Sequence, residues 1–388
     1  MHARKHPSLA IISNSVVSKM SMSGGDRIFI ELAREWQSLS YSVSILVCQE
    51  AVAMFSNLKG VRLVSLSHAS VERFGVLLGY AMRIVQSLMR VVLNPRFGQF
   101  TLVCSSSDFL TDVLPGFALS SLGGGHWVAG LFLIAPNPFR GETSLTIRSL
   151  FYYVGQKVSI FLMKCGRARV LVLNEFDKAT LCQQNGVASE RVKVISGAVD
   201  LVEVQGVRPQ EGLSFEGCFV GRFHSQKGID DLLNIWSRVC STTPRSKLAI
   251  IGWGDDTSQQ YVMARIEELG LSQNVRIFGF LDGKRKYAVM KSCRVLLFPS
   301  SRESWGLVVL EALACGLPVV AYDLPVLRSA FGDAIVTVPM RDREAFARAV
   351  LRLLEDEYTR SLFVSKGTQL SQTFSWKRIA QSTLEGIE

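Results

Sequence analysis

Short apolar runs alternate with amphipathic stretches along the whole chain, a pattern that predicts parallel α/β layers. In the first half, apolar runs typical of buried strands lie at 8–14, 43–48, 101–106, 128–135 and 169–174. Stretches with helical periodicity separate them, at 26–38, 72–93, 145–164 and 175–185. The first half therefore predicts one doubly wound unit with helices on its parallel sheet.

The second half repeats this organisation. Its predicted strands lie at 217–222, 247–252, 275–279, 295–300 and 318–323, and its predicted helices at 228–240, 257–269, 283–292, 306–315 and 342–355. The fold class is thus α/β, with two Rossmann-like doubly wound domains, 1–199 and 214–370, facing a central cleft. Residues 200–213 have little periodicity and are expected to link the domains. A terminal helix within 371–388 is expected to cross back to the N-terminal domain.

Length and composition agree with this division, and charge adds an asymmetry. The 388 residues are 48% hydrophobic, enough for two domain cores. Residues 1–195 carry 20 Lys and Arg against 11 Asp and Glu, whereas residues 196–388 carry 23 against 22. A basic first half attracts the phosphates of nucleic acid, anionic lipid or a charged acceptor, and charge alone does not choose among them.

Cysteine and histidine spacing argues against a metal centre. The eight cysteines form no C-x-x-C pair, and the five histidines show no metal-ligand spacing. We therefore predict no metal and reduced cysteines in a cytoplasmic protein. The N-terminal apolar run after "MHARKHP" is too short for a secretory signal, and the apolar stretch 74–93 is interrupted by Arg83 and Arg90, so no membrane span is expected.

The stretch "SSRESWGLVVLEALACGLPVVAYD" (300–323) carries the first candidate chemistry. It places Glu303 in a loop after a strand and Glu311 inside an apolar helix, where a carboxylate needs a hydrogen-bonding partner. The first-turn amides of that helix, near Trp305–Leu307, form an anion site. A phosphate at the amides and a hydroxyl at each carboxylate outline a nucleotide sugar. The alternative is a buried capping Glu311 and a solvated Glu303.

The stretch "FVGRFHSQKGIDDLL" (219–233) carries the second group of candidate functional residues. A strand ends at Gly221, which is predicted to belong to the donor site, and Arg222 and Lys227 follow in a short loop from which both could reach a diphosphate. Their charge would stabilise the leaving nucleotide in place of a metal ion. The alternative is a pair of solvated surface cations. The Asp230–Asp231 pair is interpreted as N-terminal helix acids rather than metal ligands.

Together with "VISGAVD" (194–200), these motifs resemble the family 4 glycosyltransferases, retaining enzymes of GT-B architecture. The resemblance covers the second half of the chain. It implies a UDP- or GDP-linked sugar as donor substrate, with no further cofactor. It assigns the donor diphosphate to Arg222 and Lys227, the transferred sugar to Glu303 and the ribose to Glu311. Amides at Trp305, Gly306 and Leu307 would hold phosphate, and Arg222, Lys227 and Glu303 would be the catalytic residues.

The first half carries fewer signals. The glycine pair Gly24–Gly25 in "SMSGGDRIFIELAREW" resembles family loops that approach the donor, although a tight turn is an alternative. Asp108, in "SSSDFLTDVLPG", and Asn137 are the predicted acceptor-binding residues. The histidine that many family members carry after the fourth strand is absent from "AGLFLIAPNPFRG", so no acceptor-side catalytic group is assigned.

The predicted function is transfer of a hexosyl unit to a hydroxyl of a glycan or lipid-linked acceptor, in cell-envelope or polysaccharide biosynthesis. The stripe 74–93 and the basic first half predict contact with an anionic membrane surface, on the inner face of the membrane; a helix packed on the sheet is the alternative. Rival functions are a nucleotide-sugar epimerase and a non-catalytic basic protein that binds lipid or nucleic acid. Nucleic acid is not expected, because aromatic and basic residues do not interleave.

Overall fold

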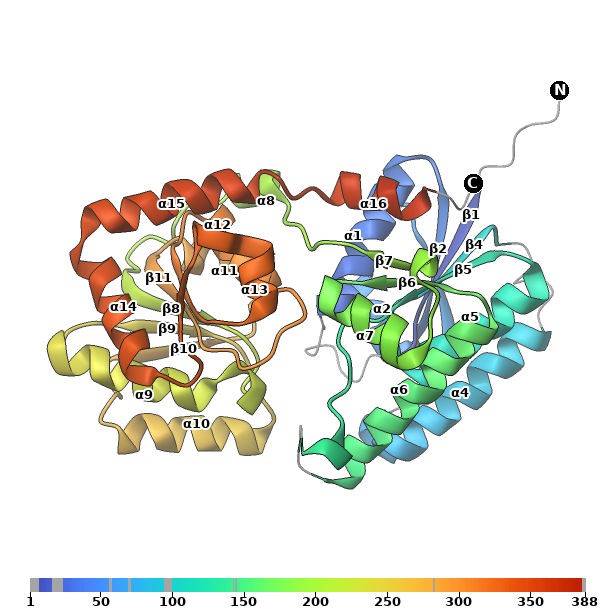
Figure 1. Ribbon diagram of the computed structural model, residues 1–388, viewed down its shortest axis with the longest axis horizontal. Coiled ribbons are helices and arrows are strands. Elements are labelled where there is room, and N and C mark those ends of the chain that lie inside the picture. The colour runs from blue at the N-terminus through green and yellow to red at the C-terminus, as the bar shows by residue number, and fades with distance from the viewer. Residues whose placement is uncertain are drawn as a thin grey trace. The chain divides into compact units, whose positions relative to one another are not determined.

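A computed structural model describes residues 7–15, 24–55, 58–68, 71–93, 100–141, 143, 145–281 and 283–385. The chain divides into two compact units. Unit 1 comprises residues 1–196 and 376–388, and unit 2 comprises residues 197–375. Figure 1 shows a layer of strands with helices on both sides in each unit.

Unit 1 is built on a sheet that has seven parallel strands within the described residues, in the order β3-β2-β1-β4-β5-β6-β7. The strands are β1 (Ser8–Ser13), β2 (Ser42–Cys48), β3 (Arg62–Ser67), β4 (Leu102–Ser105), β5 (His126–Gly130), β6 (Arg169–Val172) and β7 (Val192–Val194). In the central pair, Ile11 aligns with Cys104 and Ile12 with Ser105. Both faces of β1 and β4 are buried and mostly apolar, as expected of the centre of a parallel sheet covered by helices.

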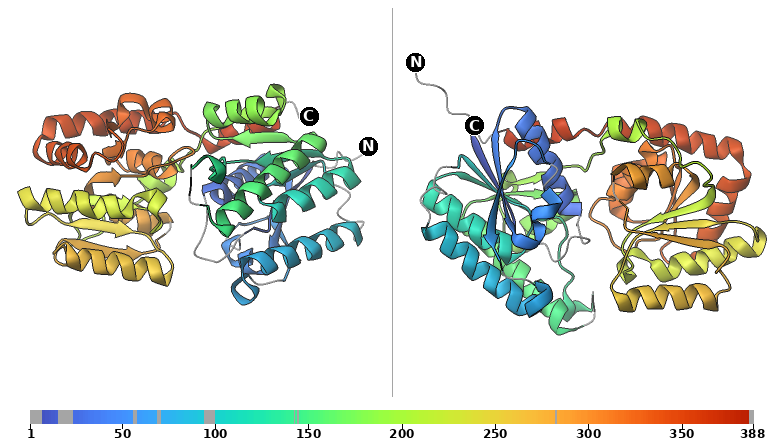
Figure 2. Two further views of the ribbon diagram at one scale, coloured as in Figure 1. Left: turned by 60° about the horizontal axis from the view of Figure 1, so that its bottom comes forward. Right: turned by 180° about the vertical axis from the view of Figure 1, so that it is seen from behind.

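The helices of unit 1 cover both faces of this sheet. They are α1 (Gly24–Ser38), α2 (Val52–Phe55), α3 (Val71–Phe74), α4 (Val76–Leu93), α5 (Leu110–Gly123), α6 (Ile147–Cys165), α7 (Glu175–Asn185) and α16 (Trp376–Leu384). The C-terminal helix α16 packs against α1, where Trp36 Nε1 donates to the carbonyl of Ala380 at 3.1 Å. Figure 2 shows the two helices beside each other.

Unit 2 is built on a second parallel sheet, of six described strands in the order β10-β9-β8-β11-β12-β13. The strands are β8 (Phe215–Val220), β9 (Leu248–Ile251), β10 (Val275–Gly279), β11 (Cys293–Phe298), β12 (Val319–Tyr322) and β13 (Val336–Val338). The helices are α8 (Leu201–Gln205), α9 (Ile229–Thr242), α10 (Asp256–Glu268), α11 (Gly283–Met290), α12 (Leu307–Ala314), α13 (Pro325–Phe331), α14 (Arg343–Glu355) and α15 (Glu357–Ser371). Its core cluster contains the fully buried Trp236.

The predicted doubly wound α/β class is confirmed for both units, and the differences from prediction are local. The strands β3, β7 and β13 and the helices α2, α5, α13 and α15 were not predicted. Residues 200–213, expected to be a linker, contain helix α8. No described helix is both long and apolar enough to cross a membrane.

Strand order reverses direction at one point in each sheet, between β1 and β4 in unit 1 and between β8 and β11 in unit 2. At such a switch point the helices that follow the two central strands lie on opposite faces of the sheet, and ligands bind in the crevice outside the carboxyl ends of these strands. The two switch points are therefore the expected positions of a ligand site in the two sheets.

Candidate active site

Two loops meet at the switch point of unit 2. The loop after β8 contains a short 3-10 turn, η5 (Ser225–Lys227), and the loop after β11 contains residues 299–306. Gln226 joins them: its carbonyl accepts from Ser301 N at 2.9 Å, and its Nε2 donates to the carbonyl of Arg302 at 2.8 Å. One backbone and one side-chain hydrogen bond thus fix the position of the two loops relative to each other.

Gly228 allows the two loops to approach this closely. Its φ of +69° lies in the left-handed region, and a Cβ there would lie 2.0 Å from the carbonyl oxygen of Pro299. Only glycine fits this backbone without displacing the loop after β11. The glycine after Lys227 therefore has a steric reason as well as a conformational one.

Lys227 and Glu303, predicted from separate motifs, form an ion pair here. Lys227 Nζ lies 2.5 Å from Glu303 Oε1, and the hydroxyl of Ser300 donates to the same oxygen at 2.6 Å. The two side chains are 23% and 9% exposed, so the pair is at the edge of the core. A lysine ammonium has three donors, and the pair leaves part of this capacity for a ligand oxygen.

Arg222 and His224 lie on the same loop. Arg222 is exposed, two residues beyond the end of β8. His224 caps the η5 turn, where its Nδ1 accepts from Gln226 N at 3.2 Å. Burial, and then the positive charges of Arg222 and Lys227, lower the pKa of His224 below its ordinary value. The imidazole is therefore a structural acceptor, and the loop keeps two cations, Arg222 and Lys227.

Glu311 has a partner that the sequence did not indicate. Lys286 Nζ, from α11, donates to both carboxylate oxygens of Glu311 at 2.8 and 2.7 Å, and Tyr287 OH lies 3.4 Å from Oε1. The lysine and glutamate side chains are only 8% and 3% exposed. The segment "GKRKYAVM" contains three cations, and the sequence alone does not show which of them meets Glu311. In the folded helix, Lys286 is buried together with Tyr287 and Met290.

The residues predicted to hold phosphate lie at the start of α12. Gly306 is the N-cap with φ +101°, and the helix begins at Leu307. The Trp305 ring is buried against Phe331 and Phe374, edge-on with ring centroids 5.1 Å apart in both cases. Trp305 therefore contributes its backbone to this end of the helix while its side chain holds the loop to the core.

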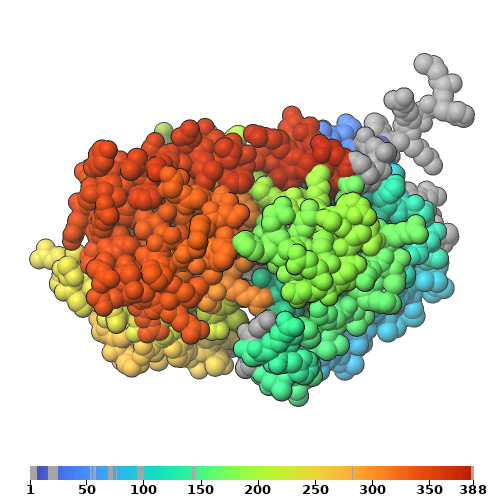
Figure 3. Space-filling view, viewed as in Figure 1, coloured from blue at the N-terminus to red at the C-terminus, as the bar shows by residue number. Residues whose placement is uncertain are grey.

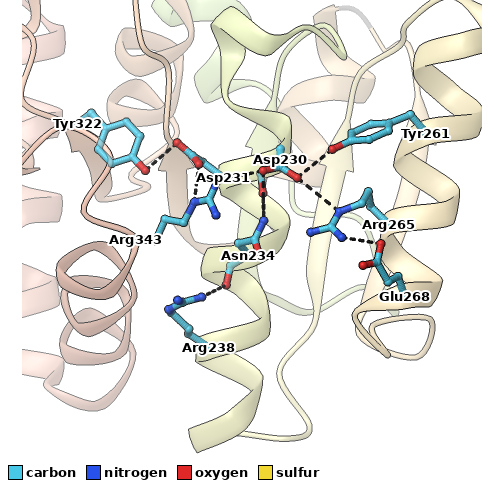
Figure 4. Close-up of polar contacts among 9 residues, drawn as sticks. All are labelled: Asp230, Asp231, Asn234, Arg238, Tyr261, Arg265, Glu268, Tyr322 and Arg343. Carbon is cyan, nitrogen blue, oxygen red and sulfur yellow. Dashed lines mark hydrogen bonds and ion pairs between the residues drawn. The ribbon is translucent and has the colours of Figure 1, made fainter.

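The acids that follow Lys227 join four elements of unit 2, as Figure 4 shows. Arg343, from α14, donates to Asp231 at 2.5 Å and to Asp230 at 2.9 Å. Tyr322 OH donates to Asp231, and Tyr261 OH to Asp230, both at 3.0 Å. The prediction that these are helix acids is consistent with their positions in the first turn of α9, and their partners fix that end of the helix.

The residues predicted in the first half all belong to unit 1. Gly24 and Gly25 begin α1, while residues 21–23 of their motif lie outside the described residues. Asp108 is buried and accepts from Gln156 Nε2 at 2.8 Å, and burial raises the pKa of its carboxyl to about 6. Asn137 caps a 3-10 turn, η3 (Pro138–Arg140), through its Oδ1, which accepts from Phe139 N at 3.0 Å.

The switch point of unit 1 holds a buried acid that sequence reasoning missed. Asp112 Oδ1 accepts from Asn14 N at 2.6 Å. Its Oδ2 accepts hydroxyls from Ser107, Ser15 and Ser106, at 2.5, 3.1 and 3.3 Å respectively. Burial is the main cause that raises the pKa of Asp112 to about 7. The serine run before it was a partial signal, because Ser106 and Ser107 supply two of the three hydroxyls that satisfy the buried acid.

Comparison with known proteins covers the two units unequally. Residues 214–370 match the family described as "Glycosyl transferases group 1". A phosphatidyl-myo-inositol mannosyltransferase of Mycobacterium leprae is 30% identical over 219 residues, 55% of this chain and 57% of that protein. The O-antigen chain mannosyltransferase B of Escherichia coli is 27% identical over 184 residues, 45% of this chain and 47% of that protein. The chain spans about half the length of the curated relatives it matches.

Solved structures match nearly the whole chain. The HepE protein of Anabaena in complex with UDP and glucose has a TM-score of 0.74 at 18% identity, over 98% of this chain and 99% of that one. Sucrose-phosphate synthase of Thermosynechococcus elongatus has a TM-score of 0.75 at 18% identity, over 97% of each chain. At such identities the likeness shows the fold. The predicted resemblance to glycosyltransferases and the GT-B architecture are thus confirmed, while the family number stays a prediction.

Proposed function

We propose that this chain, which carries a group 1 glycosyl transferase domain on a GT-B fold, is a retaining glycosyltransferase. It would move a hexosyl unit from a UDP- or GDP-linked sugar to a hydroxyl of a glycan or lipid-linked acceptor, in cell-envelope or polysaccharide biosynthesis. The observation that carries the proposal is the Lys227–Glu303 pair at the switch point of unit 2.

The donor is proposed to bind along that switch point. Arg222 and Lys227 would hold the diphosphate, together with the first-turn amides of α12, where the helix dipole favours an anion. Glu303 would accept hydrogen bonds from the sugar. Ribose hydroxyls would donate to Glu311, whose two oxygens accept from Lys286 in the structure.

The two cations supply the charge stabilisation that the reaction needs. As the glycosidic bond breaks, negative charge develops on the leaving diphosphate, and Arg222 and Lys227, which lie on one short loop, would stabilise it. The acceptor hydroxyl would attack from the face that the diphosphate leaves, which gives retention. Glu303 would orient the sugar. We propose no cofactor, an acceptor held by unit 1 with Asp108 and Asn137 nearby, and a cytoplasmic location.

The test is a panel of UDP-, GDP- and ADP-sugars, with binding followed by saturation-transfer NMR and chemistry by slow donor hydrolysis. Wild type should select one donor, and Glu303→Gln should lower the hydrolysis rate at least about 10²-fold, because it weakens the acceptor that faces the sugar. Glu344→Gln is the control, since that glutamate is exposed and pairs with Arg348 along α14.

Two results would contradict the proposal. One is a folded protein that binds none of the donors. The other is equal hydrolysis by Glu303→Gln and wild type. Conversion of a donor into its epimer without acceptor would instead assign the site to an epimerase.

A further inference from the structure

Helix α4 presents an apolar stripe to solvent. Leu78, Val85, Met89 and Val92 recur at helical spacing, and their exposed fractions lie between 51% and 62%. Large aliphatic side chains scattered singly on a surface are ordinary, but a continuous stripe along one helix face is not. This outward stripe occupies the position where a surface helix usually carries charged residues.

The inward side of α4 is more polar than its outward side. Arg83 is fully buried, where it forms an ion pair with Glu50 and donates to the carbonyl of Asn14 at 3.1 Å. Ser87 and Tyr80 are also buried on this side, and Tyr80 OH donates to the carbonyl of Ser15 at 2.8 Å. The helix therefore has its polar partners inside unit 1 and its apolar side chains outside.

Helix α6 presents a second stripe of the same kind. Ile147, Phe151, Val154, Val158 and Phe161 follow one another at intervals of four and three residues, and their exposed fractions lie between 42% and 81%. The capping box of Thr146 and Ser149 fixes where the helix starts and therefore where the stripe begins. Two independent helices thus carry the same unusual surface.

Both stripes belong to one side of unit 1. Helix α5 packs against α4 and against α6, so the three helices form one layer on the same face of the sheet. Figure 1 shows α4 and α6 in this layer, and Figure 3 shows parts of both at the surface of unit 1, α4 in light blue and α6 in green. We call the exposed side chains of α4 and α6 the helical face.

Charge selects the partner of the helical face. Neither α4 nor α6 contains an Asp or Glu, whereas Arg90, Arg148, Lys157 and Lys164 are exposed on them. A second copy of this face would bring like charges together around its apolar stripes. An anionic bilayer offers the complementary pair, phosphates for the cations and acyl chains for the apolar side chains.

We propose that the helical face binds the surface of an anionic lipid bilayer, with α4 and α6 lying in the interface. The apolar stripes enter the boundary between head groups and acyl chains, and the exposed cations Arg148 and Lys164 of α6 contact lipid phosphates. This extends the membrane contact predicted for 74–93, because it adds α6 and fixes which side of α4 meets the lipid. It does not depend on the donor or on the reaction proposed above.

The test is co-sedimentation of the full chain with two kinds of vesicle, phosphatidylcholine alone and equal parts of phosphatidylcholine and phosphatidylglycerol. Wild type should bind the mixed vesicles more strongly. Val85→Glu and Phe161→Glu should each weaken binding at least about tenfold, because each places a carboxylate among lipid-facing side chains. Met263→Glu is the matched control, an equally exposed apolar residue on α10 of unit 2.

A second pair of variants tests the electrostatic part. Arg148→Gln and Lys164→Gln should each weaken binding to mixed vesicles about fivefold, since one basic residue near an anionic surface contributes about that factor. Arg245→Gln, which removes an exposed cation of unit 2, should leave binding unchanged.

The proposal is overturned if wild type binds neither kind of vesicle, or if the unit 2 controls weaken binding as much as the unit 1 variants. It is also overturned if Val85→Glu only dissociates a dimer of this chain. Donor binding is measured on the same variants in solution without vesicles. If wild type bound no donor, this result would count against the proposed function and not against membrane binding by the helical face.

Discussion

The two switch points have the same place in their sheets but satisfy their carboxylates differently. In unit 2, Glu303 is paired with Lys227, and the nearby Glu311 is paired with Lys286. In unit 1, Asp112 accepts from one backbone amide and three serine hydroxyls, all neutral donors. Burial against neutral donors raises the pKa of Asp112 to about 7. The same topology thus produces a charged, partly open site in one unit and a closed hydrogen-bonded cluster in the other.

The unit 2 site has donors that a ligand can use, whereas the Asp112 cluster of unit 1 stabilises the fold. Lys227 remains 23% exposed beside the exposed Arg222, so cationic donors are available to a ligand. The donors to Asp112 come from residues 14–15 and 106–107, which follow β1 and β4, so the carboxylate ties the ends of those two strands together. Substitutions at these positions should separate binding from stability.

The largest effect on stability is expected for Lys286→Met. It leaves the buried Glu311 carboxylate without its cation, which costs about 3–5 kcal/mol of the free energy of unfolding. Urea unfolding followed by tryptophan fluorescence measures this, since Trp236 and Trp305 report on unit 2. The control is Lys284→Met, an exposed cation on the same helix. Equal losses in the two variants would show that the pair contributes nothing specific.

The largest effect on chemistry is expected for Lys227→Ala. Loss of this cation should lower the rate of donor breakdown about 10²–10³-fold while the unfolding midpoint changes little, because the side chain is partly exposed. Rates and thermal midpoints are compared with those of Lys366→Ala, which breaks an exposed ion pair elsewhere in unit 2. A large fall in the midpoint of Lys227→Ala alone would make its role structural and remove the contrast with Asp112.

A pH-dependent effect is expected for Asp112→Asn. Because the pKa of Asp112 is raised to about 7 in the folded chain, the folded state keeps a proton that the unfolded state loses near pH 4. The contribution of this proton to stability is therefore present at low pH and declines as pH rises from about 4 to about 7. Thermal midpoints of wild type should fall across this range.

In Asp112→Asn that fall should become shallower. The fall in thermal midpoint that remains in this variant should be complete near pH 6, because burial raises the pKa of Asp108 only to about 6. Parallel pH profiles for wild type and variant would contradict the assignment of the titration to Asp112. Asp256→Asn, at an exposed position on α10, provides the profile of an acid outside the cluster.

The smallest effect is expected for Arg343→Gln, which removes the cation shared by Asp230 and Asp231. The arginine side chain is more than a third exposed, so solvent screening limits the loss to about 1 kcal/mol. Thermal unfolding beside Arg348→Gln, a solvent-exposed arginine on the same helix, measures the difference. A loss as large as that of Lys286→Met would contradict the view that burial decides how much an ion pair contributes.

Long periodic segments were predictable, and short or atypical ones were not. The strands β1, β2 and β11 and the helices α9, α10 and α14 lie close to their predicted ranges, because apolar runs and helical periods are local signals. Helix α5 was missed because it contains Pro115 and is buried on several sides, which removes its amphipathic period. Strands β7 and β13 have only three residues each, too few to show an alternation.

The sequence by itself determined the fold class, the motif around Glu303 and Glu311, and the cations after β8, because residue order alone carries these patterns. Tertiary structure decided which charges meet. Lys286 reaches Glu311 across 25 positions and Lys227 reaches Glu303 across 76, through the packing of separate βα segments. It also decided which side of α4 faces solvent, since the pairing of Arg83 with Glu50 requires β2 and β3 to be in place. Contacts between distant segments depend on the sheet that brings them together, and no local pattern encodes their distance.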